Sequence, residues 1–397
     1  MASARRPSEA STKGTKKAGK SRFFTNIEST TLALGNSRDG PVPAACEPND
    51  EAWTRLGKPR AGDWLAEKNE SGQTFSSYRR TMGDYRVPGK HNATILLVPL
   101  GASFKRCPRF LPFLVDYARA FFTGMDIELL DTEVGSTSAG KQLSLKRVSS
   151  RENEFGAPQY LLSDLMDLVR RPKGYHYYCR LGITLEDIYP GEDWNYVFGQ
   201  ADVMERVGVF SFARHSPLFY DGVHATEALD PETRLLSDAR QAKWLRNCLH
   251  TMTHEIGHMF GIRHCIYYHC LLNGSNGPHD SAGSTFMCPV DLRKLLHALS
   301  TVPRNKGEHP CALERYRAML QVWRAVLSEF GGGEGTGECE GGGGASSSKE
   351  DEDDKTGGGG GGAAASGGRG GLAEQERQIP CIAQDVQWLE RRLAFML

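Results

Sequence analysis

The sequence predicts an α/β fold, a mixed, twisted sheet with helices packed on it. Two observations predict it: short apolar runs that end at proline or glycine, and segments between them whose apolar residues recur every three or four positions. The first run, residues 94–101, contains Pro99 and ends at Gly101, as a buried central strand would. Such alternation of strands and helices is typical of α/β domains.

The other elements follow in chain order. Strand patterns occur at residues 125–130, 178–184 and 207–213. Helical spacing predicts helices over residues 110–121, 160–170, 237–261, 292–299, 313–326 and 382–393. Ser237 is the predicted N-cap of the longest of these helices, because its hydroxyl can accept from a free backbone N–H of the first turn.

The composition predicts one ordered domain with flexible parts. Residues 1–35 are basic and poor in apolar side chains, which predicts a disordered basic tail, and residues 36–84 are a poorly patterned N-terminal segment. We expect the ordered domain over residues 85–330. Residues 331–371, rich in glycine with an acidic run, are a predicted flexible linker, and residues 372–397 a predicted C-terminal helix that packs on the domain.

Charge and hydropathy exclude several classes of function. The formal net charge of +0 argues against a nucleic-acid-binding protein, and no apolar run is long enough for a membrane span. Without an apolar leader the chain is expected in the cytoplasm, and its basic tail also allows a nuclear location; we expect a monomer. In that reducing compartment its ten cysteines are better explained as thiols or metal ligands than as disulfides.

A metal-binding motif ends the longest predicted helix. Residues 254–264 read HEIGHMFGIRH. Positions four apart lie about 6 Å apart along a helix and on one face, so His254 and His258 can share one ion. Gly261 can adopt a positive φ and turn the chain, which brings His264 in as a third ligand. Three protein ligands leave a fourth position open, as catalysis by Zn²⁺ requires.

Glu255 follows the first ligand and is rotated about 100° around the helix, beside the metal and not toward it. A carboxylate there can act as general base on the attacking water. The predicted reaction is hydrolysis of peptide bonds. The alternative is a zinc-stapled, non-catalytic interaction module, in which Glu255 would have no purpose.

The motif continues into a cysteine pattern that resembles a known family. His264 is followed by Cys265 and Cys270 and, after 17 further residues, by Cys288-Pro-Val-Asp291. This pattern resembles the archaemetzincins, the archaelysin family of metzincin-type zinc metallopeptidases, and the resemblance covers residues 94–300. It implies a metzincin-type domain, a peptide or unstructured protein substrate, and two zinc ions, one catalytic and one structural. The structural zinc would be held by Cys265, Cys270 and Cys288.

Two positions depart from the family pattern. Asp291 stands where the family has a fourth cysteine, and it is either a zinc ligand or the N-cap of the next helix, with His269 or His279 as other fourth ligands. Leu272 stands where the family has a methionine, so the turn beneath the zinc has either lost its methionine or takes it from Met287.

Other residues gain a possible role from the resemblance alone. Residues 207–213 are either the edge strand that pairs with an extended substrate or a buried structural strand. Tyr189, Tyr267 and Tyr268 either assist the oxyanion or are ordinary interior aromatics. Arg214 pairs either with a substrate carboxylate or with a structural acid.

Overall fold

The computed structural model describes residues 4–5, 27–48, 52–130, 145–276, 283–305, 312–331 and 382–397. Most of the predicted basic tail and all of the predicted linker except Gly331 lie outside these residues. Among the described helices, none is both long and apolar enough to cross a bilayer.

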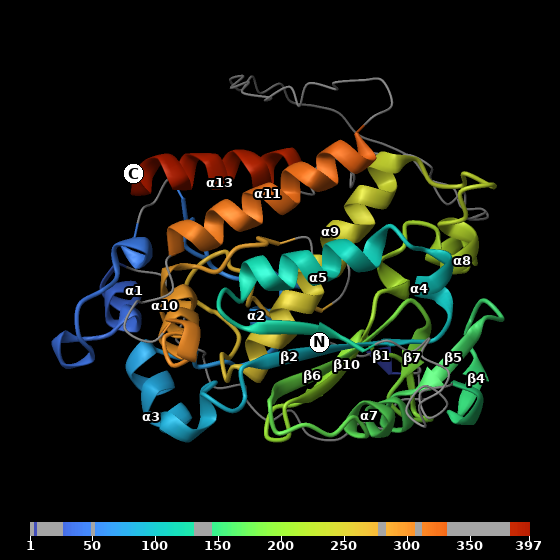
Figure 1. The fold of residues 1–397 in the computed structure, drawn as a ribbon, viewed down its shortest axis with the longest axis horizontal. Helices are drawn as coiled ribbons and strands as arrows, with labels where there is room; N and C mark the ends of the chain where they lie inside the picture. The colour runs from blue at the N-terminus through green and yellow to red at the C-terminus, as the bar shows by residue number, and fades with distance from the viewer. Residues whose placement is uncertain are drawn as a thin grey trace, which may run out of the picture. The chain divides into compact units, whose positions relative to one another are not determined.

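A five-stranded mixed sheet forms the centre of the domain, in the order β3-β2-β6-β10-β9 (Figure 1). Its strands are β2 (Thr94–Leu100), β3 (Asp126–Leu129), β6 (Tyr177–Thr184), β9 (Gly199–Asp202) and β10 (Val207–Ser211). Four of them are parallel, and β9 pairs antiparallel with β10 at one edge. Every residue of β2 is buried, as expected for a strand covered on both faces.

The position of β10 corrects one of the two readings of residues 207–213. This strand lies between β6 and β9, so it is not the edge strand, and all its residues are buried. The edge strand next to β10 is β9, which was not predicted because Gly-Gln-Ala-Asp has no apolar alternation.

Helices cover both faces of the sheet. Alternate residues of β2 enter two hydrophobic cores: Ile95 and Leu97 the larger one, Leu96 and Val98 the smaller one against α7. In Figure 1, α7 lies on one side of the sheet and α5 and α9 on the other. The helices are α1 (Ile27–Leu34), α2 (Trp64–Glu67), α3 (Phe75–Arg86), α4 (Ser103–Arg106), α5 (Phe110–Phe121), α7 (Leu162–Arg170), α8 (Ala225–Ala228), α9 (Asp238–Met259), α10 (Pro289–Leu299), α11 (Ala312–Phe330) and α13 (Ile382–Met396).

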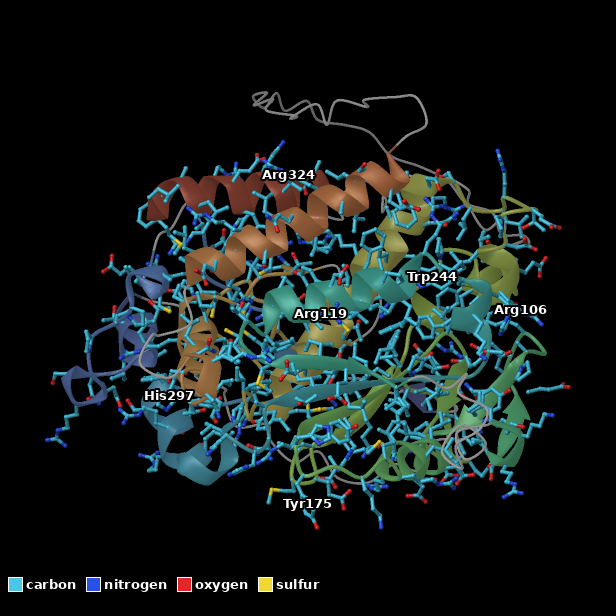
Figure 2. All side chains as sticks on the ribbon, in the orientation of Figure 1. Arg106, Arg119, Tyr175, Trp244, His297 and Arg324 are labelled. Atoms are coloured by element: carbon cyan, nitrogen blue, oxygen red, sulfur yellow. The ribbon has the colours of Figure 1, made fainter. Side chains whose placement is uncertain are left out.

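Smaller elements frame the central sheet. A three-stranded sheet joins β4 (Ser150–Glu152), β5 (Pro158–Leu161) and β7 (Asp187–Tyr189), and β1 (Ala4–Arg5) pairs with β8 (Trp194–Tyr196). Short 3₁₀ turns occur at Ser37–Asp39, Ala44–Cys46, Leu145–Arg147, Ala213–His215, Phe219–Asp221 and Pro303–Asn305. Tyr175, labelled in Figure 2, is 99% exposed in the loop before β6.

The N-terminal part of the chain is more ordered than predicted. Residues 27–34 form α1, whose Leu34 is buried in the larger core, so the predicted tail boundary at residue 35 is wrong. In the segment 36–84, Trp53 and Tyr78 are also buried. Arg293 of α10 fixes the polar segment that follows α1. Its guanidinium donates to the backbone carbonyls of Leu34, Asp39, Gly40 and Pro41. Such long-range contacts leave no periodic signal in the sequence.

The C-terminal helix α13 packs along α11 and reaches α9. Asp385 of α13 forms a buried ion pair with Arg246 of α9, with Oδ2 to Nε at 2.5 Å, and accepts a hydrogen bond from Thr285. Trp388 stacks on Phe286 with ring centroids 3.9 Å apart. The helix therefore holds the middle of α9 and the segment that leads to Cys288.

Candidate metal centre

Helix α9 carries the first part of the site. Ser237 is its N-cap and accepts a hydrogen bond from the Arg240 N–H, as predicted. Trp244, labelled in Figure 2, is buried and its indole donates to the carbonyl of Phe212 at 2.9 Å. This contact ties α9 to the end of β10 and fixes the helix against the sheet.

The structure brings the three predicted histidines together. The Nε2 atoms of His254 and His258, one turn apart on α9, are 3.0 Å apart. Gly261 has φ +77° and turns the chain after the helix, so that one nitrogen of each histidine, His264 included, lies within 4.8 Å of the others. For Zn–N bonds of about 2.0–2.1 Å in a tetrahedron, neighbouring nitrogens lie about 3.3 Å apart. The arrangement therefore fits Zn²⁺.

Each imidazole donates its Nδ1–H to an oxygen, which leaves Nε2 free for a metal. The three contacts are His254 to Leu271 O at 2.7 Å, His258 to Ile262 O at 2.7 Å and His264 to Glu70 Oε1 at 2.8 Å. Burial, reinforced by repulsion from the neighbouring imidazoles, lowers the pKa of His254 well below its usual value and that of His258 to about 3. Neutral imidazoles are the form that binds zinc.

Glu255 lies directly after His254 on α9, and its side chain is buried. Its side chain is 4% exposed, and among the described residues Oε1 has no hydrogen-bond partner. Burial raises its pKa to about 7. A buried carboxyl group left unpaired next to a metal site can accept and release a proton near neutral pH.

A cleft of about 1010 Å³ opens over the site, lined by Glu255, His258 and His264. Residues of the edge strand β9 and of the N-terminal segment line it as well. The other lining residues are Asn69, Glu70, Ser71, Gly72, Gln73, Thr81, Met82, Pro190, Trp194, Val197, Gly199, Gln200, Ala201, Val203, Met204, Gly261, Ile262 and Arg263. A groove walled by a free strand edge suits an extended peptide.

Several residues weighed for substrate contacts lie elsewhere. Tyr189, Tyr267 and Tyr268 are buried and do not line the cleft, so the interior reading is correct for all three. Arg214 is 2% exposed and pairs with Asp187 and Glu154, so it satisfies structural acids.

No sequence pattern predicted the residues that support the turn into His264. The Gln73 amide donates to Gly261 O at 3.1 Å and accepts from the Arg263 N–H at 3.2 Å. The Tyr78 hydroxyl donates to Phe260 O at 3.0 Å. These partners are more than 180 residues apart in the chain, beyond the range of any motif.

The second predicted cluster is also assembled. One ligand atom each from Cys265, Cys270, Cys288 and Asp291 lies within 4.8 Å of the others. The Cys265 and Cys288 sulfurs are 3.6 Å apart, too far for a disulfide bond of about 2.05 Å. That separation is close to the edge of about 3.8 Å of a tetrahedron with Zn–S bonds of about 2.3 Å.

Asp291 is not the N-cap of α10, so that reading is wrong. The N-cap is Cys288, and Asp291 is the third helical residue. Its Oδ2 accepts from the Cys270 thiol at 3.3 Å, and its Oδ1 pairs with the Lys294 ammonium at 2.6 Å. His269 is exposed and outside the cluster, and His279 lies outside the described residues.

Leu272 and Met287 share the apolar floor beneath the catalytic helix. A Cβ added to Gly257 would lie 3.3 Å from a methyl of Leu272 and 3.5 Å from Cε of Met287. Met287 therefore lies beside the position that the family's methionine would occupy, and both side chains support the same turn of α9.

Gly261→Ala is expected to destabilise the protein by more than about 1–2 kcal/mol, the usual cost of a left-handed conformation with a side chain. The excess arises because the new Cβ would collide with Sδ of Met82. Gly156→Ala is the matched control, since Gly156 has φ +74° and no atom within 4 Å of the added Cβ. Urea unfolding of both variants measures the difference, and equal losses would contradict the expectation.

Comparison with known proteins identifies the family. The chain is 31% identical over 278 residues to archaemetzincin-2 of Macaca fascicularis, an alignment that covers 65% of this chain and 71% of that protein. The chain belongs to the archaemetzincin family. Archaemetzincin-2 of Homo sapiens is 30% identical over 278 residues (65% and 71%), and archaemetzincin-1 of Homo sapiens 26% over 280 residues (67% and 53%). No family model matches the chain.

Two solved structures are also similar to the chain. The crystal structure of archaemetzincin from Methanopyrus kandleri is 24% identical, covers 54% of this chain and 95% of its own, and superposes with a TM-score of 0.32. A zinc-dependent peptidase from Methanocorpusculum labreanum is 17% identical, covers 51% and 99%, and gives a TM-score of 0.35. The predicted resemblance to archaemetzincins is confirmed by the sequence relatives, and the chain is a zinc metallopeptidase of this family.

Proposed function

We propose that this archaemetzincin hydrolyses peptide bonds with a catalytic zinc on His254, His258 and His264 and with Glu255 as the general base. One observation carries the proposal: three imidazoles converge beside a buried carboxyl group whose Oε1 has no hydrogen-bond partner among the described residues. When bound, zinc would acidify the attacking water and polarise the scissile carbonyl.

The chain's own residues supply the remaining steps. Glu255 would take a proton from the attacking water and deliver it to the leaving amine. In the metal-free site, burial raises the pKa of Glu255. Strand β9, which pairs with β10 alone among the described strands and whose Gly199, Gln200 and Ala201 line the cleft, would pair with an extended peptide backbone. The substrate is therefore a peptide or an unstructured protein segment. The monomeric state and the cytoplasmic or nuclear location stay predictions from the sequence.

Incubation of the full chain with a mixture of unstructured peptides tests the proposal. We expect cleavage by the zinc-loaded protein, loss of cleavage after chelation, and recovery with Zn²⁺. His258→Ala should bind no zinc at the histidine site and cleave nothing. Absence of cleavage by the zinc-loaded wild type would favour the non-catalytic interaction module.

We also propose that Cys265, Cys270, Cys288 and Asp291 hold a second, structural zinc. Four protein ligands close the coordination sphere, which is typical of structural sites. All four residues are almost fully buried, and the Lys294 ammonium forms an ion pair with the carboxylate of Asp291. Burial raises the pKa of Asp291 in the metal-free site, so a bound cation would favour its carboxylate form.

Metal analysis of the purified chain is expected to give about two zinc ions per chain, falling to about one in a Cys265→Ser, Cys270→Ser double variant. The double variant should also unfold at lower temperature, because metal binding is coupled to folding. Cys179→Ser, which removes a buried thiol from β6, should keep both ions. A single zinc in the wild type, removed by His254→Ala, would show that the cysteine cluster binds no metal.

A further inference from the structure

A segment without regular sheet structure, residues 52–73, lies over the loop that carries Cys265 and Cys270; we name it the strap. Backbone hydrogen bonds fix the strap to that loop: Leu56 N–H donates to Tyr267 O at 3.1 Å, and His269 N–H donates to Thr54 O at 2.9 Å. The side chain of Asn276 adds a hydrogen bond to Gly62 O at 2.7 Å. The strap therefore has a defined position relative to the histidine site.

Two strap residues reach His264. Glu70 Oε1 accepts from His264 Nδ1 at 2.8 Å, and the same oxygen accepts from the Trp64 indole N–H at 2.8 Å. The Trp64 ring stands edge-on to the imidazole, with centroids 5.3 Å apart and an interplanar angle of 82°. Gly274 makes this possible, because a Cβ there would collide with the indole.

His264 depends on this contact more than the other two histidines depend on theirs. His254 and His258 are held by a helix and donate to backbone carbonyls, which have fixed positions. His264 lies on the turn after Gly261, and its acceptor is a side chain that could adopt other rotamers. A carboxylate that accepts from Nδ1 fixes the ring orientation and makes the other nitrogen a stronger ligand.

We propose that Trp64 and Glu70 form a positioning pair for the third zinc ligand. Glu70 orients His264, and Trp64 acts through Glu70 by holding its carboxylate on the imidazole and away from the cleft that Glu70 also lines. This inference rests on the proposed role of His264 as a ligand of the catalytic zinc. It assigns to the N-terminal segment a part in metal binding that the histidine motif does not contain.

The affinity of the histidine site for zinc tests the positioning pair. It is measured on the full chain by competition with a chelating dye, after the zinc ion at the histidine site has been removed. Glu70→Ala should weaken zinc binding by about 10–100-fold, and the isosteric Glu70→Gln by less, since its amide oxygen can still accept. Trp64→Phe keeps an aromatic ring but loses the indole N–H that donates to Glu70, so it should weaken zinc binding less than Glu70→Ala does. Glu67→Gln, an exposed carboxyl of the same strap, should bind zinc as the wild type does.

A double variant separates positioning from general packing. If Trp64 acts through Glu70, then Trp64→Phe should weaken zinc binding in the wild type and have no further effect in the Glu70→Ala background. Additive effects, or wild-type affinity in both Glu70 variants, would overturn the inference. Failure of the proposed function would look different: the wild type would then hold no zinc that His254→Ala removes.

Discussion

Glu255→Gln is expected to lower the turnover number by about 10²–10⁴-fold while the catalytic zinc stays bound, the range that general acid–base catalysis contributes. This loss corresponds to about 3–5 kcal/mol of transition-state stabilisation. The amide has nearly the shape of the carboxyl group, so the cleft and the three imidazoles should keep their positions. What it lacks is the ability to take a proton from the attacking water.

The measurement is the rate of cleavage of an unstructured peptide at saturating Zn²⁺, together with the zinc content of the variant. Glu67→Gln, exposed on the strap, is the control for loss of one carboxylate. Undiminished turnover in Glu255→Gln with bound zinc would refute Glu255 as the base. Loss of the zinc itself would point to a role of Glu255 in metal binding.

Asp385→Ala is expected to lower the free energy of unfolding by about 3–5 kcal/mol, because it leaves a buried cation without its partner. The side chain of Arg246 is 1% exposed, and its guanidinium donates two hydrogen bonds to the carboxylate of Asp385. The Thr285 hydroxyl loses its acceptor in the same variant.

Glu390→Ala on the same helix is the matched control. Glu390 pairs with Arg324, labelled in Figure 2, at 2.7 Å, but the two side chains are 45% and 60% exposed. Solvent-exposed pairs contribute about 0–1 kcal/mol, so this variant should unfold almost as the wild type does. Urea unfolding of both variants gives the comparison. A loss below about 1 kcal/mol in Asp385→Ala would show that this ion pair contributes little to stability.

The elements predicted correctly are those whose signal is local. Strand β2 has a continuous apolar run, and α9 has both a helical stripe and an N-cap at Ser237, so neighbouring residues suffice to define them. Strand β9 has neither, since its position at the edge follows from pairing with β10. Helix α1 was missed because a short apolar segment next to a basic tail does not reveal what it packs against.

The site residues also differ in whether their role is visible in the local sequence. The histidine and cysteine ligands lie in one stretch of sequence with meaningful spacing, so their chemistry could be inferred before any coordinates. Glu70, Trp64 and Gln73 carry no such pattern, and their role depends on contacts across about 190 residues. Asp291 is an intermediate case, because an aspartate at this position suits both a helix N-cap and a metal ligand. The structure excludes the N-cap interpretation, since Cys288 is the N-cap of α10.

The pairing of α13 with α9 bears on the order in which the domain folds. Arg246 is synthesised 139 residues before Asp385. Until Asp385 has been synthesised, the guanidinium of Arg246 lacks the acid that forms its buried ion pair in the folded domain. We expect α9, which carries the histidine motif, to reach its final packing only after α13 has left the ribosome.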